Sequence, residues 1–435
     1  MMDRKKLARQ IFQDTLAGID IPATIQQKLQ PSNGAILAGE LRVNLREYRD
    51  ILAISIGKAA VALAEGIDAI LAPEFRYRGI LAGPSKPKRL PDWDAIVSGH
   101  PVPNEGSFRA GRAILEALRK CGRDTLVIFL LSGGGSSLVE LPLDENVSLE
   151  NFVKLHHALV TCGAPIEEIN AIRKHLSAVK GGRMAAAAPD AMKLTFGVTD
   201  VPEGQETALA SGPTLPDPTT VQDAERIAQK FGILEKLPAK LRAKFERHEL
   251  QETPKAGDRA FANAHFELLL GRHDLFHHAH IAAEAVGFFT VCDNATDGWP
   301  VEKAAAHLLE QLDKIACSNP GRPVALIADG EVSSPVTGNG TGGRNSAFAL
   351  ACVEKIAGRD VTVLSAGTDG VDGNSSAAGA VADGTTLERA HAAKVDPREF
   401  FERSDAFTFF ERLQDAIITG PTGNNLRDLR ILLAG

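Results

Sequence analysis

Short runs rich in Val and Ile alternate along this chain with longer amphipathic stretches, and this alternation constrains the fold more than any other feature. The short runs have the length of buried strands, and the longer stretches have helical periodicity. Strands that alternate with helices form mainly parallel sheets covered by helices. Strands are expected at residues 51–56, 79–82, 95–98, 125–131, 194–198, 288–292, 324–328, 361–365 and 429–433. Helices are expected at residues 107–120, 148–160, 166–177, 221–229, 301–315 and 346–356.

The length of the chain and one interruption in the alternation predict two domains. A chain of 435 residues is too long for one ordinary domain. The charged stretch 236–257 carries no strand signal, so it is the best boundary. We predict an α/β protein of two three-layer α/β/α domains with mainly parallel sheets, spanning residues 1–245 and 255–435.

Composition and charge exclude several classes of protein. The net charge of -7 comes without a basic stripe, so nucleic acid is not an expected partner. We expect no membrane span, because no apolar run is long enough. The first residues form an amphipathic helix rather than a secretory signal, and the five scattered cysteines are typical of free thiols. A cytoplasmic protein is expected, and the oligomeric state stays open, with a homodimer as one alternative.

Three glycine-rich segments follow predicted strands, where open α/β sheets place their ligands. Successive backbone N–H groups in such turns can form a nest that binds phosphate oxygens. A single glycine-rich turn is more often a simple chain reversal. Three of them, flanked by hydroxyls, an arginine and carboxylates, favour ligand binding. The first two consist of Ser132, Gly133, Gly134, Gly135, Ser136 and Ser137, and of Gly338, Asn339, Gly340, Thr341, Gly342 and Gly343; the third spans residues 367–373.

Two familiar motifs do not fit these segments well. The tripeptide 56–58 resembles the end of a P-loop, but Leu52 and Ala59 occupy positions that this motif requires to be Gly and Ser or Thr. The Gly338–Gly343 segment matches the dinucleotide fingerprint G-x-G-x-x-G. However, that fingerprint should open directly from its strand, and residues 331–337 intervene. The match is therefore a weak indication of NAD binding.

Charged residues near the segments indicate phosphate chemistry. Lys58 follows a strand at a strand-to-helix turn and can act as a point charge toward phosphate. Arg344 follows the second glycine-rich segment and is expected to open a helix. Asp369 lies in the third segment and can hold Mg²⁺ through a carboxylate oxygen, although a turn-capping role is common for such residues. Arg173 precedes Ser177 by one helical turn, so both can face one site.

Taken together, these segments resemble the class II glycerate 2-kinases, which have an N-terminal Rossmann-like domain and a C-terminal MOFRL domain. The resemblance covers nearly the whole chain, and it implies an active site in the cleft between the domains, with ATP and a divalent metal. It implies that Lys58, Asp200, Arg344 and Asp369 contact phosphate, substrate or metal. One departure is that a second acid expected after Asp200 is displaced to Glu203. The stretches that carry the resemblance are ISIGKAA, SGHPVPNEGS, LLSGGGSSLVELP, INAIRKHLSAVKGGR, GVTDVPEGQETALASGPTLPDPTT, ADGEVSSPVTGNGTGGRNSAFAL, SAGTDGVDGNSSAAGA and ITGPTGNNLRDLRILL.

The resulting hypothesis is an ATP-dependent glycerate 2-kinase whose substrates are glycerate and ATP. Phosphates would rest on the first two glycine-rich segments with Lys58 and Arg344, and Asp369 or Asp200 would hold Mg²⁺. Asp200 would orient or deprotonate the acceptor hydroxyl. Arg173, with the Ser136 and Ser137 hydroxyls, would hold the acceptor carboxylate. A hydroxypyruvate reductase using NAD(P)H is the alternative enzyme, and a nucleotide-sensing protein without turnover is a third class.

Overall fold

The computed structural model describes residues 3–199, 201, 204–424 and 426–435. The chain divides into two compact units. The N-terminal unit is Ile21–Leu270, and the C-terminal unit is Gly271–Gly435 together with the first twenty residues, Met1–Asp20. The prediction of two α/β units is confirmed. Within the described part of the chain, no helix is both long and apolar enough to cross a membrane.

The division of the chain into units runs differently from the predicted ranges 1–245 and 255–435. Helix α1 (Arg4–Gly18) buries Ala8, Ile11 and Phe12 and packs on strands of the C-terminal unit. The charged stretch that was predicted as a boundary contains a helix, α10 (Ala239–Glu246), which packs into the N-terminal unit through Leu241 and Phe245. Two buried apolar residues among many charges are a weak signal in the sequence, but they are enough to hold the helix in a core.

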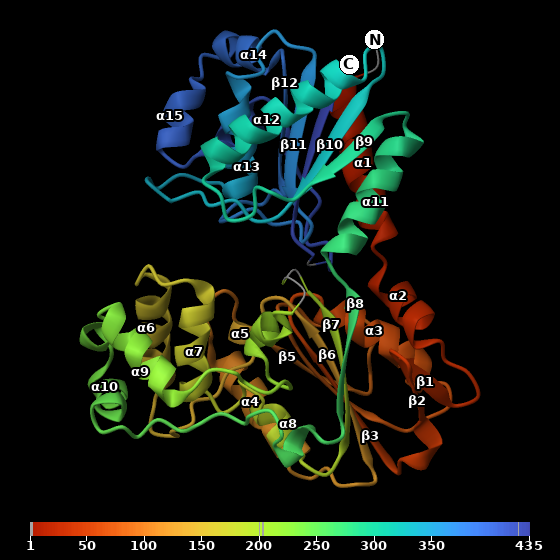
Figure 1. The fold of residues 1–435 in the computed structure, drawn as a ribbon, viewed down its shortest axis with the longest axis vertical. Helices are drawn as coiled ribbons and strands as arrows, with labels where there is room; N and C mark the ends of the chain where they lie inside the picture. The colour runs from red at the N-terminus through yellow and green to blue at the C-terminus, as the bar shows by residue number, and fades with distance from the viewer. Residues whose placement is uncertain (1–2, 200, 202–203, 425) are drawn as a thin grey trace. The chain divides into compact units, whose positions relative to one another are not determined.

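A six-stranded parallel sheet forms the centre of the N-terminal unit (Figure 1). All neighbouring strands pair parallel, so every strand ends at the same edge of the sheet. The core strand β6 is buried at each of its eight positions, as expected for a sheet covered on both faces. The strands, in sheet order, are β5 (Trp93–Val97), β4 (Arg78–Gly83), β3 (Asp50–Ile56), β6 (Thr125–Ser132), β7 (Met192–Val198) and β8 (Ala264–Leu270).

Helices cover both faces of this sheet, and a further group of helices has a core of its own. On one face, α3 (Ala60–Leu71) packs against the strands and α2 (Ile21–Leu29) packs against α3; on the other, α4 (Glu105–Leu118) and α8 (Arg183–Ala186) share a core with β3 and β6. An antiparallel pair, β1 (Ala35–Ala38) and β2 (Leu41–Asn44), lies outside the sheet. The helices with a separate core are α6 (Leu149–Val160), α7 (Ile166–Leu176), α9 (Val221–Lys230) and α10.

Strands β3 and β6 are the topological switch point of the sheet. From β3 the chain continues through β4 to β5 on one side, whereas from β6 it continues through β7 to β8 on the other. The connections that leave the ends of β3 and β6 therefore diverge. In open α/β sheets, such a point forms a crevice in which ligands bind.

The C-terminal unit contains a mixed six-stranded sheet, so the prediction of mainly parallel sheets holds only for the N-terminal unit. The last strand of the chain inserts between β10 and β11 and runs against both of them. Among the described strands, only β9 and β10 are parallel neighbours in this sheet. The sheet order is β13 (Ala416–Ile417), β12 (Gly379–Asp383), β11 (Val361–Gly367), β14 (Asp428–Ala434), β10 (Val324–Asp329) and β9 (Phe289–Asp293).

Helices cover both faces of the mixed sheet as well (Figure 1). Helices α1 and α11 (Arg272–Ala285) lie on one face, and α12 (Val301–Ser318) and α13 (Arg344–Val353) lie on the other. Alternate residues of β10, β11 and β14 pack against α12 and α13 in one large core. Three short helices complete the unit: α14 (Thr386–Ala392), α15 (Pro397–Glu402) and α16 (Ala406–Arg412).

Candidate anion site at the switch point

The two turns that leave β3 and β6 are joined through their backbones. The amide of Lys58 donates to the carbonyl of Gly133 at 2.9 Å, and the amide of Ala59 donates to Oγ of Ser132 at 3.0 Å. Gly57 has φ +126°, and a Cβ at this position would lie 2.1 Å from Oγ of Ser132. Only glycine therefore allows the two strand ends to approach this closely, and the approach brings Lys58 to the first glycine-rich loop, residues 132–137.

The amides of this loop are available to a ligand. Among the described residues, no acceptor takes a hydrogen bond from the amides of Gly133, Gly134, Gly135 or Ser136. Gly134 has φ +80°, and a Cβ there would lie 3.1 Å from Cγ of Lys58 and 3.2 Å from the ring of His100. The loop thus combines unsatisfied donors with a lysine and a histidine. Such a turn can bind an anion.

Hydroxyl groups link the loop to a strained segment and to α7. Oγ of Ser136 lies 2.8 Å from Oγ of Ser211, which in turn donates to Oδ1 of Asn170 at 3.4 Å. Oγ of Ser137 lies 2.9 Å from Nδ1 of His100. Ser211 has φ +61°, a left-handed conformation that costs free energy for any residue with a Cβ and is concentrated at functional sites.

Arg173 of α7 adds a cation for which the described residues supply no anionic partner. Its guanidinium donates to Oδ1 of Asn170 and approaches Nδ1 of His156, both at 3.4 Å. In the part of the chain that the structure describes, no carboxylate forms an ion pair with it, because nearby Glu140 pairs with buried Lys180. Burial lowers the pKa of Arg173. Burial and the charge of Arg173 lower the pKa of His156 to about 4. The surroundings therefore favour a bound anion.

The second glycine-rich loop, residues 338–343, differs in that the amides of its last four residues have partners inside the protein. The amide of Gly340 donates to the carbonyl of Arg403 at 3.1 Å, and that of Thr341 donates to Oδ1 of Asp405 at 2.9 Å. The amide of Gly342 donates to Oδ1 of Asn374 at 2.8 Å. The amides of Gly343 and Asn345, at the start of α13, donate to side-chain acceptors as well. Phosphate binding by this loop stays a prediction, and it would require these bonds to be exchanged.

Arg344 is also engaged, although it opens α13 as predicted. Its guanidinium forms two hydrogen bonds of 2.6 Å with the carboxylate of Glu331 and further bonds with Asp428. Burial lowers the pKa of Arg344, but the two carboxylates outweigh burial and raise it. Arg344 is therefore a neutralised cation, whereas no described carboxylate neutralises Arg173.

The predicted metal residues are only partly described. Asp200 and Glu203 lie outside the described residues. Oδ1 of Asp369 accepts a hydrogen bond from the amide of Val371 at 3.0 Å, which is a turn-capping contact. A Cβ on Gly367 would lie 3.0 Å from Oδ1 of Asp369 and 3.4 Å from Oδ1 of Asp428, so two carboxylates flank this glycine. In the residues described, no three His, Cys, Asp or Glu side chains are arranged to hold a metal. One or two carboxylates suffice for Mg²⁺ when phosphates supply other ligands, so Asp369 fits that role.

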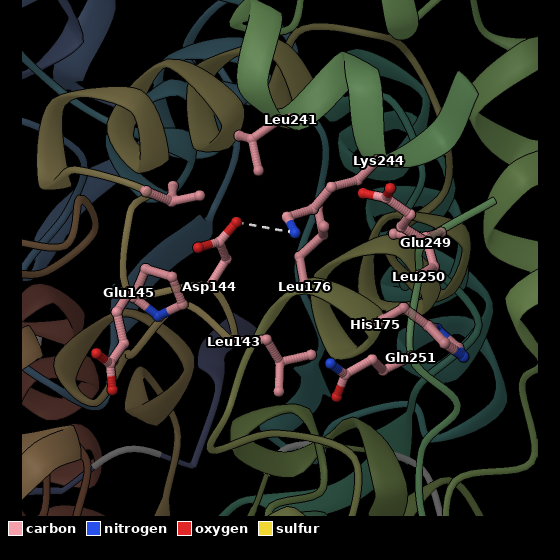
Figure 2. A pocket seen from close by; sticks show the side chains of 12 residues that line it. Leu143, Asp144, Glu145, His175, Leu176, Leu241, Lys244, Glu249, Leu250 and Gln251 are labelled. Atoms are coloured by element: carbon pink, nitrogen blue, oxygen red, sulfur yellow. Dashed lines mark ion pairs between the residues drawn. The ribbon is translucent and has the colours of Figure 1, made fainter. Parts of the chain in front are cut away.

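A hollow of about 240 Å³ lies elsewhere in the N-terminal unit, beside α10 (Figure 2). Asp144 and Lys244 form an ion pair of 2.9 Å across it. The hydrogen bond from Lys244, with one from the amide of Asn146, lowers the pKa of Asp144 to about 2. No predicted site residue is among those that line this hollow.

The structure adds residues that the sequence did not single out. Asn170, Ser211 and His156 join the predicted Arg173 and Ser136 around the first loop. Two of these residues could have been found from the sequence. Asn170 lies on the same helical face as Arg173, and Ser211 directly precedes a Gly-Pro turn. His156 had no signal, because only the packing of α6 against α7 brings its ring to Arg173.

The fold and this site define an α/β protein with a glycine-rich anion site at a topological switch point. Residues 7–246 match a family model described as a domain of unknown function (DUF4147), and residues 324–428 match the MOFRL family. The D-glycerate 2-kinase of Thermotoga maritima is 35% identical, covering 88% of this chain and 90% of its own. A relative from Agrobacterium vitis, provisionally named hydroxypyruvate reductase, is 36% identical, covering 88% of this chain and 86% of its own. The crystal structure of Thermotoga maritima glycerate kinase has a TM-score of 0.82 at 34% identity and covers 99% of both chains. The chain belongs to the class II glycerate kinase family.

Proposed function

We propose that this protein is a glycerate 2-kinase, which transfers the γ-phosphoryl group of ATP to the 2-hydroxyl of D-glycerate. The hydroxyl oxygen forms a bond to the γ-phosphorus, the bond from that phosphorus to the bridging oxygen breaks, and ADP leaves while the hydroxyl proton is lost. The kinase names of relatives that align with most of the chain support this proposal. Phosphoryl transfer needs alignment and charge neutralisation more than covalent catalysis, and the switch-point site offers both.

The observation that carries the proposal is the open first loop beside Lys58. Four successive amides, Gly133 to Ser136, lack an acceptor among the described residues, and Lys58 lies against Gly134. Fixed donors of this kind can hold phosphate oxygens without reorganising during the reaction. The remaining cation, Arg173, suits the carboxylate of the acceptor, because a guanidinium binds a carboxylate through two parallel hydrogen bonds.

Proton transfer and metal binding complete the proposal. The prediction that Asp200 accepts the hydroxyl proton concerns a residue outside the described part, and it stays a prediction. Mg²⁺ would supply further neutralisation of the phosphate charge, and Asp369 would hold it. Asp369 needs only to turn its carboxylate toward the space beside Gly367.

The reductase alternative has no geometric support at its fingerprint. Strand β10 ends at Asp329, and the fingerprint begins only at Gly338, so the motif does not open from its strand. The amides of Gly340, Thr341 and Gly342, which would have to face a pyrophosphate, donate to protein acceptors instead. A dinucleotide site would also need a hydride-transfer acid or base, and the sequence offers no convincing position for one.

A coupled assay tests the proposal directly. The purified protein should consume ATP only when D-glycerate and Mg²⁺ are both present, and the product should be 2-phosphoglycerate, identified by its phosphorus NMR spectrum. Chelation of the metal should stop the reaction. Oxidation of NADH or NADPH by hydroxypyruvate, with ATP left untouched, would reject the kinase in favour of the reductase.

A further inference from the structure

A buried carboxylate directly after the first loop takes no part in the proposed transfer. Glu140 stands two residues beyond the short helix α5 (Gly135–Leu138), which contains the end of the loop, and it is only 2% exposed. Its Oε1 accepts hydrogen bonds from the hydroxyl of Ser177 at 2.5 Å and from the amide of Leu141 at 2.9 Å. Its Oε2 accepts from the ammonium group of Lys180, which is buried as well. Both carboxylate oxygens therefore have donors, and the charge has a buried counter-charge.

Glu140 joins the first loop to the C-terminal end of α7, the helix that carries Arg173. Its partner Ser177 follows α7 directly and stands one helical turn after Arg173. A backbone hydrogen bond joins the same two segments, because the amide of Ala178 donates to the carbonyl of Leu141 at 2.7 Å. The segment that ends the loop and the segment that ends the helix are therefore held together by one buried side chain and by their backbones.

Stability alone explains the buried ion pair of Glu140 and Lys180 poorly. Removing two charges from water is costly, and apolar residues of similar volume often stabilise a protein as well or better. A buried charged pair is better suited to fixing one arrangement of the chain, because any displacement leaves a charge without its partner. The pair also lies within electrostatic reach of the site. Burial lowers the pKa of Arg173, and the charge of Glu140 opposes that shift. Burial, then Arg173 and then Lys180 lower the pKa of His156.

We propose that Glu140 is a positioning residue, which holds Arg173 at a fixed distance from the amides of the first loop. The inference rests on the proposed function, in which the loop holds phosphate oxygens and Arg173 holds the carboxylate of the acceptor. The distance between these two groups then sets where the acceptor hydroxyl lies relative to the phosphorus. A displacement of about 1 Å in such an alignment can cost about 100-fold in rate. Glu140 acts through Arg173 and does not contact the substrate itself.

Two variants separate the reach of the Glu140 side chain from its charge. Glu140→Asp keeps the charge but shortens the side chain by one methylene, so it can meet both Ser177 and Lys180 only if the segments move. Its kcat should fall by roughly 10- to 100-fold, and its KM for glycerate should rise. The double variant Glu140→Gln with Lys180→Met removes both charges and keeps the lengths of the side chains. Its kcat should stay within about threefold of that of the unmodified enzyme.

The matched control is a second buried ion pair on the same helix. Lys174 and Asp217 pair at 3.1 Å, and their side chains are as buried as those of the first pair. The further partners of Asp217 include Thr219 and Thr253, which lie outside the loop. Lys174→Met with Asp217→Asn should lower the midpoint of urea unfolding but leave kcat and the KM for glycerate within about twofold. Circular dichroism verifies that each variant is folded.

NMR titration of His156 reports the position of Arg173 without turnover. In Glu140→Asp, a displaced guanidinium should let the pKa of His156 rise from about 4 toward 6.5, and in the control pair it should stay at about 4. If a folded Glu140→Asp enzyme keeps its kcat or this pKa, the inference fails and the proposed function stands. A double variant that loses more activity than Glu140→Asp also overturns the inference, because charge rather than reach would then decide. If the unmodified enzyme does not phosphorylate glycerate, the proposed function fails, and the titration still decides whether Glu140 positions Arg173.

Discussion

The two glycine-rich loops of this protein look alike in sequence and differ in what they leave open. Among the described residues, the amides of residues 133–136 in the first loop have no acceptor and the nearby Arg173 has no carboxylate partner. In the second, side chains and carbonyls accept from the amides of residues 340–343, and two carboxylates neutralise Arg344. Glycine content alone therefore does not identify an anion site. The availability of donors does, and it depends on residues far away in the sequence.

The largest effect that tests this difference is expected at Lys58. Lys58→Ala removes the positive charge beside the open loop, and kcat should fall by about 100-fold or more, as for other groups that stabilise a developing charge. The control is Lys230→Ala, because Lys230 is an exposed lysine of α9 that pairs with Glu168. A folded Lys58→Ala enzyme with the turnover of the control would remove this residue from the reaction.

Replacement by methionine should impair substrate binding at Arg173 and protein stability at Arg344. Arg173→Met should raise the KM for glycerate by roughly 10- to 100-fold, because a bidentate charged contact to the carboxylate is lost. Arg344→Met removes the ion pairs with Glu331 and buried Asp428, so the free energy of unfolding should fall by roughly 1–3 kcal/mol. Steady-state kinetics and urea unfolding of both variants check this. Equal loss of stability in both would contradict the difference between the arginines.

The lowered pKa of His156, beside Arg173, should make the stability of the protein depend on pH. The unfolded chain protonates this histidine near pH 6.5, whereas in the folded protein its pKa is about 4. Between pH 6.5 and pH 4, the unfolded chain binds a proton that the folded protein does not bind. The free energy of unfolding should therefore fall as the pH drops through this range. The loss from this group is about 1 kcal/mol after allowance for its partial exposure.

His156→Gln should remove that part of the slope in urea unfolding at pH 7 and pH 4.5. Tripolyphosphate should raise the pKa of His156 in NMR titrations, because a bound anion offsets the charge of Arg173. A pKa that does not respond to the anion would place the anion elsewhere.

The smallest effect is expected at the second loop. Asn374 accepts from the amide of Gly342 and donates to the carbonyl of Gly340, and it is exposed. Asn374→Ala should lower the free energy of unfolding by only about 0.5–1 kcal/mol. Tripolyphosphate affinity should not change, because the freed amide faces a loop that other bonds still hold. A gain in tripolyphosphate affinity would show that this loop, too, can act as a phosphate site.

The sequence predicted the central strands well, because buried parallel strands are continuous apolar runs. β6 was expected at 125–131 and spans Thr125–Ser132. The sequence did not predict β8 (Ala264–Leu270), whose burial is incomplete, or β12, whose small residues resemble a loop. It located Lys58 and the first loop, since a strand end followed by glycines is a local signal. It could not tell the first loop from the second, because the acceptors that engage the second loop come from Asn374, Arg403 and Asp405.

The first helix has a consequence for how the protein is made. α1 packs on β11 and β14, but at about 5–20 residues per second the ribosome needs roughly 20–70 s to proceed from this helix to Val361, where β11 begins. During that interval α1 lacks its contacts with these two strands. The whole N-terminal unit is synthesised in between. The part of this face that α1 covers can therefore form only after β14 has been synthesised, so docking of the first helix waits for the last strand of the sheet.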